Sequence, residues 1–208
     1  MAGPVFPFET PLSLTPTALP AWIGAAMAVG SLAAVALEQR GRLPNPAWRP
    51  RRDWLREAAW VGQYGQGTCV AVVVLLVGLL DAIRGWSAAA FVLTATLGTW
   101  AAGYACKRAA GRVRPGGQKR GAIPGEFLGF DRNAASWRES FPSSHAAGAM
   151  ALSGALALLY PPAAPVFWAL GAATAALRWL GGAHWLGDVL AGVALGLLGG
   201  WATATLWP

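Results

Sequence analysis

Six apolar runs alternate with polar segments along the chain. The apolar runs cover residues 17–37, 68–83, 88–106, 145–160, 163–177 and 188–207. Most of them approach the roughly 20 residues that a helix needs to cross the hydrocarbon core of a bilayer. Periodicity does not separate helix from strand inside such uniformly apolar runs, but lipid offers no water to satisfy the backbone, which favours helices. The pattern predicts an all-α, polytopic membrane protein with six transmembrane helices and a single integral-membrane domain over residues 1–208.

The polar segments are predicted to gather on one membrane face. With six spans, both termini share one side, and the connections after the first, third and fifth spans share the other. These connections are residues 38–67, 107–140 and 178–187. Lysine, arginine, histidine and aspartate cluster in the last two of them or at the adjoining span ends. The parity of the spans therefore predicts an active site at that face.

The first polar connection contains a short amphipathic stretch. Asp53 is a candidate N-cap, and Trp54, Ala58 and Val61 fall on one side of the helix that follows. A short helix of this kind is predicted to lie in the plane of the membrane interface.

Composition supports the membrane assignment and narrows the partners. The chain is 55% hydrophobic and only 12% charged, with a mean hydropathy of +0.44, whereas soluble domains carry about 25% charged residues. The net charge of +7 does not indicate a nucleic-acid partner, because the basic residues flank apolar runs and no aromatic–basic binding module is present. Membrane lipids are the predicted partners, and the sequence does not predict the oligomeric state. Residues 1–16 contain no lysine or arginine, so the first run is expected to be a retained span rather than a cleaved signal peptide.

The first chemical cluster follows the third span. Lys107 and Arg114 are seven residues apart, which returns a side chain to nearly the same helix face. Arg108 and Arg112 lie between them, and Pro115 is expected to stop the helix. Lysine binds a phosphate as a point charge and arginine as a planar two-pronged donor. Anchoring to lipid headgroups is the alternative interpretation of these cations.

The second cluster, Pro142-Ser143-Ser144-His145, leads directly into the fourth span. Proline and serine suit the first turn and cap of a helix. A helix start presents free backbone N–H groups and a positive dipole end, which can seat a phosphate oxygen. An ordinary N-cap with a surface histidine is the competing interpretation.

The third cluster consists of Arg178, His184 and Asp188. His184 and Asp188 are four residues apart and would be in contact if that stretch is helical. A carboxylate bonded to one ring nitrogen fixes the tautomer and leaves the other nitrogen free to attack or to move a proton. An unpaired carboxylate is costly in an apolar span, so a histidine partner explains Asp188 better than a simple helix cap does.

Metal binding is the main rival chemistry for these clusters. Two histidines and one aspartate could ligate zinc, but Lys107, Arg114 and Arg178 would share the pocket and repel a divalent cation. The same three cations would attract a phosphate dianion. The charge balance therefore favours phosphate and predicts no metal.

Together, Lys107-x6-Arg114-Pro115, Pro142-Ser143-Ser144-His145 and Arg178-x5-His184-x3-Asp188 closely resemble the three-part signature of the type 2 phosphatidic acid phosphatase superfamily. The resemblance covers roughly the third to sixth spans. Two positions depart from the family pattern. Ser144 replaces the usual glycine and could either crowd a backbone N–H or add a donor. Leu177 replaces the usual serine before the arginine, which removes a possible hydrogen bond.

The resemblance implies a metal-independent hydrolase without a cofactor. His184 would attack phosphorus to form a phosphohistidine, with Asp188 orienting its ring, and His145 would serve as general acid and then as general base. Binding of the phosphate oxygens would fall to the remaining residues of the signature, namely Lys107, Arg114, Ser143, Ser144 and Arg178. Polyprenyl diphosphate, phosphatidate, phosphatidylglycerol phosphate and a lipid A phosphate fit as substrates. A lipid phosphotransferase using the same phosphohistidine and a non-catalytic lipid-binding protein are the alternatives.

Charge distribution predicts which membrane face carries the site. Fifteen of the sixteen lysines and arginines fall on the motif-bearing side and only Arg84 on the other. The positive-inside rule then places the site on the cytoplasmic face of a bacterial-type inner membrane. The resemblance points instead to the periplasm, because bacterial lipid phosphatases of this type often face it.

Overall fold

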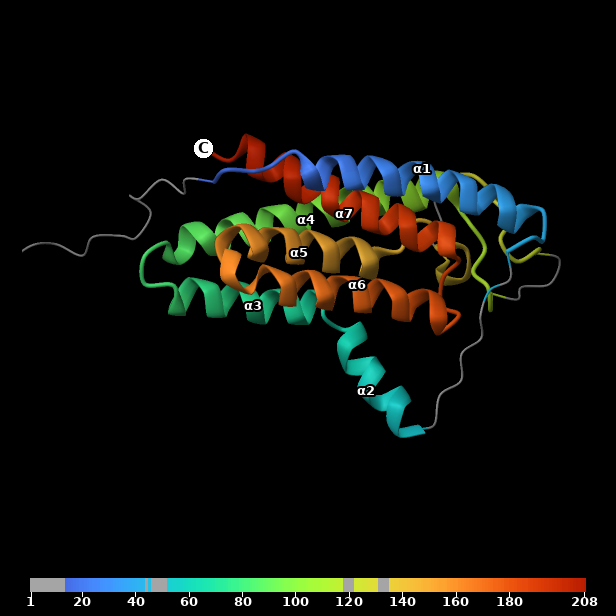
Figure 1. The fold of residues 1–208 in the computed structure, drawn as a ribbon. Coiled ribbons are helices and arrows are strands. Elements are labelled where there is room, and N and C mark those ends of the chain that lie inside the picture. The colour runs from blue at the N-terminus through green and yellow to red at the C-terminus, as the bar shows by residue number, and fades with distance from the viewer. Residues whose placement is uncertain (1–13, 44, 46–51, 118–121, 131–134) are drawn as a thin grey trace, which may run out of the picture.

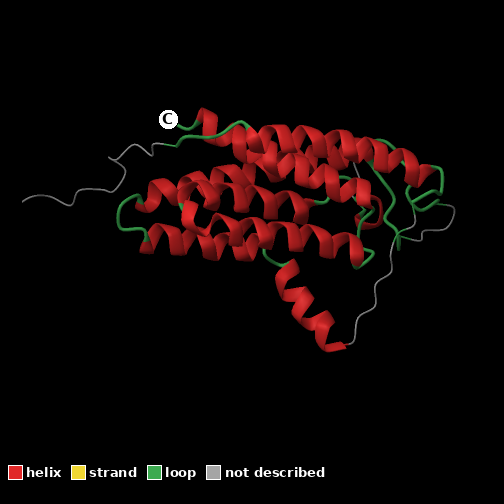
Figure 2. Ribbon diagram, in the orientation of Figure 1, coloured by secondary structure: helices red, strands yellow, loops and turns green. Residues whose placement is uncertain are grey.

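The computed structural model describes residues 14–43, 45, 52–117, 122–130 and 135–208, with the side chains of residues 52–56 outside the description. Helices are its main elements, and the described residues form no β-strand longer than an isolated bridge (Figure 2). The α-helices are α1 (Leu19–Gln39), α2 (Arg52–Gly62), α3 (Gly67–Leu80), α4 (Gly85–Ala110), α5 (Ser144–Leu159), α6 (Ala164–Leu180) and α7 (Leu186–Leu206), with 3-10 turns at Ser136–Arg138 and Pro161–Ala163.

Six of these helices, α1 and α3 to α7, correspond to the six apolar runs, and their ends differ from the predicted ends by a few residues. Four helical segments in the described residues are long and apolar enough to cross a membrane, and α3 and α5 are shorter apolar helices. The protein is a multi-pass membrane protein, and the prediction of an all-α polytopic fold is confirmed.

Helix α2 lies across the direction of the other helices and projects away from the bundle (Figure 1). Thr174 Oγ1 of α6 donates a hydrogen bond to the Val61 carbonyl of α2 at 2.9 Å, and α2 packs against α6 at this point. The helix starts at Arg52, so Asp53 lies inside it rather than at the predicted N-cap. The side chains of Asp53 and Trp54, on which the amphipathic interpretation partly rests, lie outside the described residues.

Helix α5 is the centre of the bundle and packs against α4, α6 and α7. Close approach to α7 depends on small residues: a Cβ on Gly192 would overlap the Ser143 carbonyl, and one on Gly196 would overlap the Ala147 carbonyl. In lipid, no hydrophobic driving force brings helices together, so close packing of one backbone against another is a main source of the affinity between helices.

The end of the bundle opposite the motif residues is held by one polar cluster. Arg84 pairs with Asp81 at 2.9 Å, and the Tyr160 hydroxyl donates to the same carboxylate at 3.0 Å. These contacts tie the α3–α4 turn to the end of α5. The C-terminus also lies at this end (Figure 1).

The motif residues lie at the other end. There α1, α4 and α6 finish, α5 and α7 begin, and the long α4–α5 connection folds over them (Figure 1). The face predicted from the parity of the spans is therefore the one at which the structure gathers these segments.

Candidate active site

A left-handed glycine redirects the chain out of α4. Gly111 has φ of +57°, which an L side chain rarely adopts, and it ends the helix at Ala110. The backbone then pairs Arg112 with Phe127 in an isolated bridge, and the Arg114 N–H donates to the Trp137 carbonyl. The prediction that Pro115 stops the helix is wrong, because the helix ends five residues earlier.

Lys107 and Arg114 converge by a route other than the predicted common helix face, since Arg114 lies beyond the end of α4. Both side chains donate to the Glu139 carbonyl, Lys107 Nζ at 2.6 Å and Arg114 Nη2 at 3.2 Å. Arg114 also donates from Nε to the Ser136 carbonyl at 2.7 Å and from Nη1 to the Ala183 carbonyl at 3.3 Å. The folded connection therefore aligns the two cations.

The His184 ring is held by a backbone carbonyl. Nδ1 lies 2.9 Å from the Ser140 oxygen, and a carbonyl only accepts, so Nδ1 carries the proton and Nε2 keeps its lone pair. Nε2 lies 3.4 Å from Nη1 of Arg114. The free nitrogen is thus directed at a cationic group that suits a phosphate.

Asp188 is close to His184 but is not the nearest acceptor of its Nδ1 proton. Oδ2 lies 3.7 Å from Nδ1, because His184 precedes α7 rather than forming part of its first turn. The condition for the predicted contact, a helix that includes both residues, is therefore not met. The carboxylate instead accepts from the Ser140 hydroxyl and, at 3.0 Å, from the Trp185 N–H. Ser140 therefore links the two groups, through its carbonyl to the ring and through its hydroxyl to the acid.

Arg112 anchors Asp188 from the other side. It has no exposed surface and pairs with Asp188 Oδ1 at 2.7 Å and with Glu38 Oε2 at 2.9 Å. Glu38 also accepts from the Gly187 N–H at 3.0 Å, so the end of α1 is fastened to the start of α7. The guanidinium lies over the rings of Phe127 and Trp185 as well.

Sequence reasoning missed the roles of Arg112, Glu38, Ser140 and Gln66. An acid at the end of an apolar run was a usable signal for Glu38, and Arg112 was treated only as one cation of a basic segment. Ser140 and Gln66 carried no comparable signal, since their roles depend on how the connections fold.

Helix α5 begins at the centre of the site. Ser143 is its N-cap, its N–H donates to the Asp188 carbonyl at 2.9 Å, and its hydroxyl is buried with no hydrogen-bond partner. Ser144 is the first helical residue and is half-buried. The His145 ring contacts the side-chain amide of Gln66 through Nε2.

Arg178 lies in the last turn of α6, and its Nε is buried without a hydrogen-bond partner. A buried donor without a partner costs free energy of about 1–3 kcal/mol. Unpaired donors on Arg178 and Ser143, both at this end of the bundle, are what a site built for an anion would contain.

The charged groups of the site act on one another. His145 is within electrostatic range of Lys107, Arg114, Arg178 and His184. Burial, together with the positive charges of Arg114 and Lys107, lowers the pKa of His184 to about 4, and Asp188 opposes this shift. Burial also lowers the pKa of Arg114, which stays a cation at neutral pH. His184 is therefore a neutral imidazole among cations at neutral pH.

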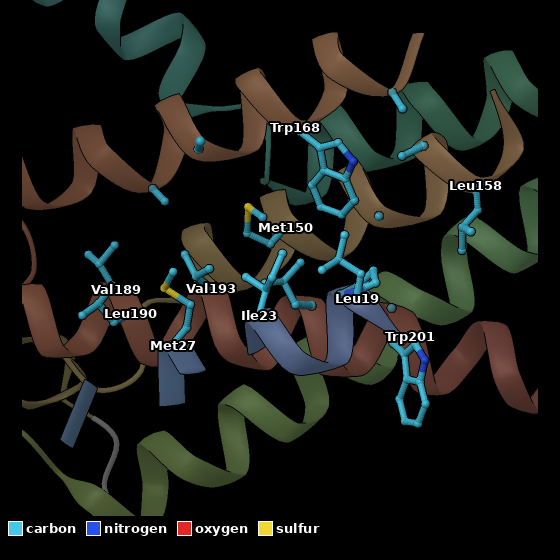
Figure 3. Close-up of a pocket in the computed structure, with 18 of the residues that line it drawn as sticks. Leu19, Ile23, Met27, Met150, Leu158, Trp168, Val189, Leu190, Val193 and Trp201 are labelled. Carbon is cyan, nitrogen blue, oxygen red and sulfur yellow. The ribbon is translucent and has the colours of Figure 1, made fainter. Parts of the chain in front are cut away.

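An apolar groove approaches the site from within the bundle. It has a volume of about 780 Å³ and is lined mainly by residues of α1, α5, α6 and α7 (Figure 3). Among the lining residues in the described part of the chain, Thr17 is the only polar one. One end lies at Trp179, Leu186 and Val189. Trp179 lies in the last turn of α6 and Leu186 at the start of α7, so this end of the groove is at the end of the bundle that holds the charged cluster.

No group of three histidine, cysteine, aspartate or glutamate side chains is placed to hold a metal ion within the described residues. The donors that converge there are mainly cationic or neutral N–H and O–H groups, which suit an anion.

These features define a multi-pass membrane protein with basic and imidazole side chains gathered at one end of its helical bundle. The family model for the PAP2 superfamily matches residues 20–208, and the chain belongs to this superfamily. No curated protein matches the chain. Its structure is similar to the crystal structure of a transmembrane PAP2 type phosphatidylglycerolphosphate phosphatase from Bacillus subtilis, with a TM-score of 0.60, 18% identity, and coverage of 90% of this chain and 94% of that one. At that identity the likeness establishes the fold.

Proposed function

We propose that this protein is an integral-membrane lipid phosphatase that works through a phosphohistidine on His184. The observation that carries the proposal is the geometry of that ring: Nδ1 donates to the Ser140 carbonyl, and Nε2 keeps a lone pair beside Arg114. A neutral, oriented imidazole next to a cationic anion site has the properties of a nucleophile for a phosphoryl group.

In the first step, His184 Nε2 forms a bond to phosphorus as the bond from phosphorus to the leaving oxygen breaks. The ring then carries positive charge, which Asp188 stabilises from 3.7 Å. His145 gives a proton to the departing alkoxide, or to the departing phosphate when the substrate is a diphosphate. Lys107, Arg114 and Arg178 hold the equatorial oxygens, with Ser143 and Ser144 as further donors.

In the second step, water replaces the histidine. His145, now neutral, takes a proton from water as the water oxygen attacks phosphorus. The P–N bond breaks, phosphate leaves, and both histidines return to their initial protonation states. The cycle needs only water and the lipid phosphate, and EDTA is expected to leave it intact.

The apolar groove supports a lipid as the carrier of this phosphate. From Leu186 to Trp201, both of which line it, α7 rises about 22 Å at 1.5 Å per residue. Met27 and Met150 give its wall flexible apolar surface that adapts to irregular chains. A hydrocarbon tail in this groove would place its headgroup at the charged end.

Phosphate release from purified protein tests the proposal. The substrates are polyprenyl diphosphate, phosphatidate, phosphatidylglycerol phosphate and a lipid A phosphate, each assayed with EDTA present. We expect release from at least one lipid by the wild type and none by a folded His184→Ala variant. Normal turnover by that variant contradicts the mechanism, and transfer to an acceptor lipid without free phosphate indicates the phosphotransferase alternative.

We further propose that the site faces the cytoplasm of a bacterial-type inner membrane. The supporting observation is the excess of lysine and arginine in the connections on the site-bearing side. Within the described residues, Arg84 is the only lysine or arginine at the other end, and it is paired with Asp81.

A further inference from the structure

We propose that Gln66 is a positioning residue that sets the ring orientation and tautomer of His145. The inference rests on the proposed function for the role of His145 in proton transfer. Its starting point is a contact between residues 79 positions apart: the side-chain amide of Gln66 meets Nε2 of the His145 ring. No motif of the sequence contains Gln66.

The fold brings Gln66 to this place through close backbone packing. Gly65 lies directly on the first turns of α5, where an added Cβ would overlap the backbone of His145 and Ala149. Gly148 of α5 is the glycine on the opposite side of this contact, where an added Cβ would overlap the Gly65 carbonyl and the Trp100 indole. Two glycines thus allow the α2–α3 connection to touch α5, and the next residue after Gly65 reaches the histidine.

Gln66 is also the N-cap of α3, but its side chain does not cap that helix. Its backbone is extended, with φ of −95° and ψ of 158°, and the side chain makes no capping hydrogen bond. The polar end of the side chain is directed at His145 instead. A role limited to helix capping therefore does not account for its orientation.

An amide suits a histidine that changes protonation state during a reaction. The amide nitrogen of Gln66 faces Nε2 of the ring, and an amide nitrogen only donates, so this contact selects the neutral tautomer that carries its proton on Nδ1. After rotation, the amide oxygen can accept from Nε2 of the charged ring. A carboxylate can only accept and would favour the charged ring. The cations that act on His145 are Lys107 from α4, Arg114 after α4 and Arg178 from α6, and the neutral His184 before α7 is the other titratable group near it. A neutral partner holds the ring among these cations without adding a negative charge that would repel the phosphate.

Ring ¹⁵N NMR tests the inference directly, because the chain has only two histidines. In protein with ¹⁵N-labelled histidine, a His184→Asn variant assigns the His145 signals. We expect Gln66→Ala to move these signals toward a mixture of tautomers and Gln66→Glu to raise the pH at which the ring titrates. Gln63→Ala is the matched control, since Gln63 is an exposed glutamine three residues upstream. His145 signals that are identical in the wild type and in Gln66→Ala overturn the inference.

Kinetics supply the second readout. Gln66→Ala is expected to lower kcat by roughly tenfold to a hundredfold with little change in KM, because displacing a catalytic group by about 1 Å costs up to about 10²-fold. Gln66→Glu is expected to restore much of kcat and to move the alkaline limb of the pH profile upward. Loss of thermal stability without these changes would assign Gln66 a structural role only. A wild type that releases no phosphate contradicts the proposed function, whereas the NMR result still decides whether Gln66 sets the tautomer.

Discussion

Arg112 and Asp188 form an ion pair with no solvent exposure on either side chain, with Nη1 and Oδ1 2.7 Å apart. The same guanidinium holds Glu38 at 2.9 Å. Buried pairs of this kind contribute little net stability, because desolvation offsets the attraction. The planar fork of arginine does fix two carboxylates at once, which a lysine cannot reproduce. The pair therefore holds the acid that lies beside the proposed nucleophile.

Removing this guanidinium is expected to destabilise the protein. Arg112→Met leaves two buried carboxylates without their partner, and breaking a buried pair costs about 3–5 kcal/mol. Unfolding of the purified protein in detergent, followed by circular dichroism, measures the effect. Arg40→Met is the control, since Arg40 is exposed just after the end of α1. Equal unfolding free energies for the two variants would contradict the assignment.

The low pKa of His184 predicts an unusual titration. With its pKa lowered from 6.5 to about 4, chiefly by burial, the ring stays neutral well below pH 6 and loses its lone pair only as the pH falls through about 4. ¹⁵N NMR of labelled histidine in a His145→Gln variant follows this ring without interference from substrate ionisation. The acid limb of kcat/KM assigned to the free enzyme is expected at the same pH. A titration midpoint near 6.5 would show that the ring is solvated instead.

The unpaired hydroxyl of Ser143 predicts that its removal weakens substrate binding without lowering the stability of the protein. The Ser143 hydroxyl makes no hydrogen bond within the described residues, so the thermal midpoint of Ser143→Ala is expected to stay unchanged. KM for the lipid phosphate is expected to rise about tenfold, the equivalent of one hydrogen bond to a charged group.

Ser153→Ala is the matched comparison for that variant. Ser153 is also buried, but its hydroxyl donates to the Phe167 carbonyl at 2.7 Å. The substitution is expected to lower stability by about 1 kcal/mol and to leave KM unchanged. The reverse pattern in the two variants would exclude Ser143 from phosphate binding.

The spans and the face of the site could be predicted from the sequence because they depend on the lengths of the apolar runs and on the parity of their connections, not on local contacts. It did not predict how Lys107 and Arg114 meet, because a left-handed glycine between them interrupts the helix. The four-residue spacing would bring His184 and Asp188 into contact on a helix, whereas His184 lies before α7 and its ring bonds to a carbonyl. The partners Ser140 and Gln66 come from connections whose paths depend on tertiary packing rather than on any pattern of residue types.

The apolar groove predicts a dependence of activity on the hydrocarbon chain. Ala172 lines the groove, and Ala172→Trp is expected to lower kcat/KM for a long-chain lipid phosphate by about tenfold, since displacing roughly two buried CH₂ groups costs that much. Hydrolysis of a short, water-soluble phosphate monoester is expected to stay unchanged. Ala173→Trp is the control, because Ala173 is exposed on α6 and does not line the groove. Equal effects of Ala172→Trp on both substrates would show that the tail does not occupy this groove.

The charge asymmetry predicts the orientation in the membrane. The C-terminus lies at the end of the bundle opposite the site (Figure 1), so a cytoplasmic site requires an external C-terminus. A C-terminal reporter that is active only outside the cytoplasm is expected to be active, and a fluorescent reporter that folds only inside is expected to stay dark. An N-terminal fusion supplies the control, because an even number of spans requires both ends to give the same result. An internal C-terminus would place the site outside and contradict the cytoplasmic assignment.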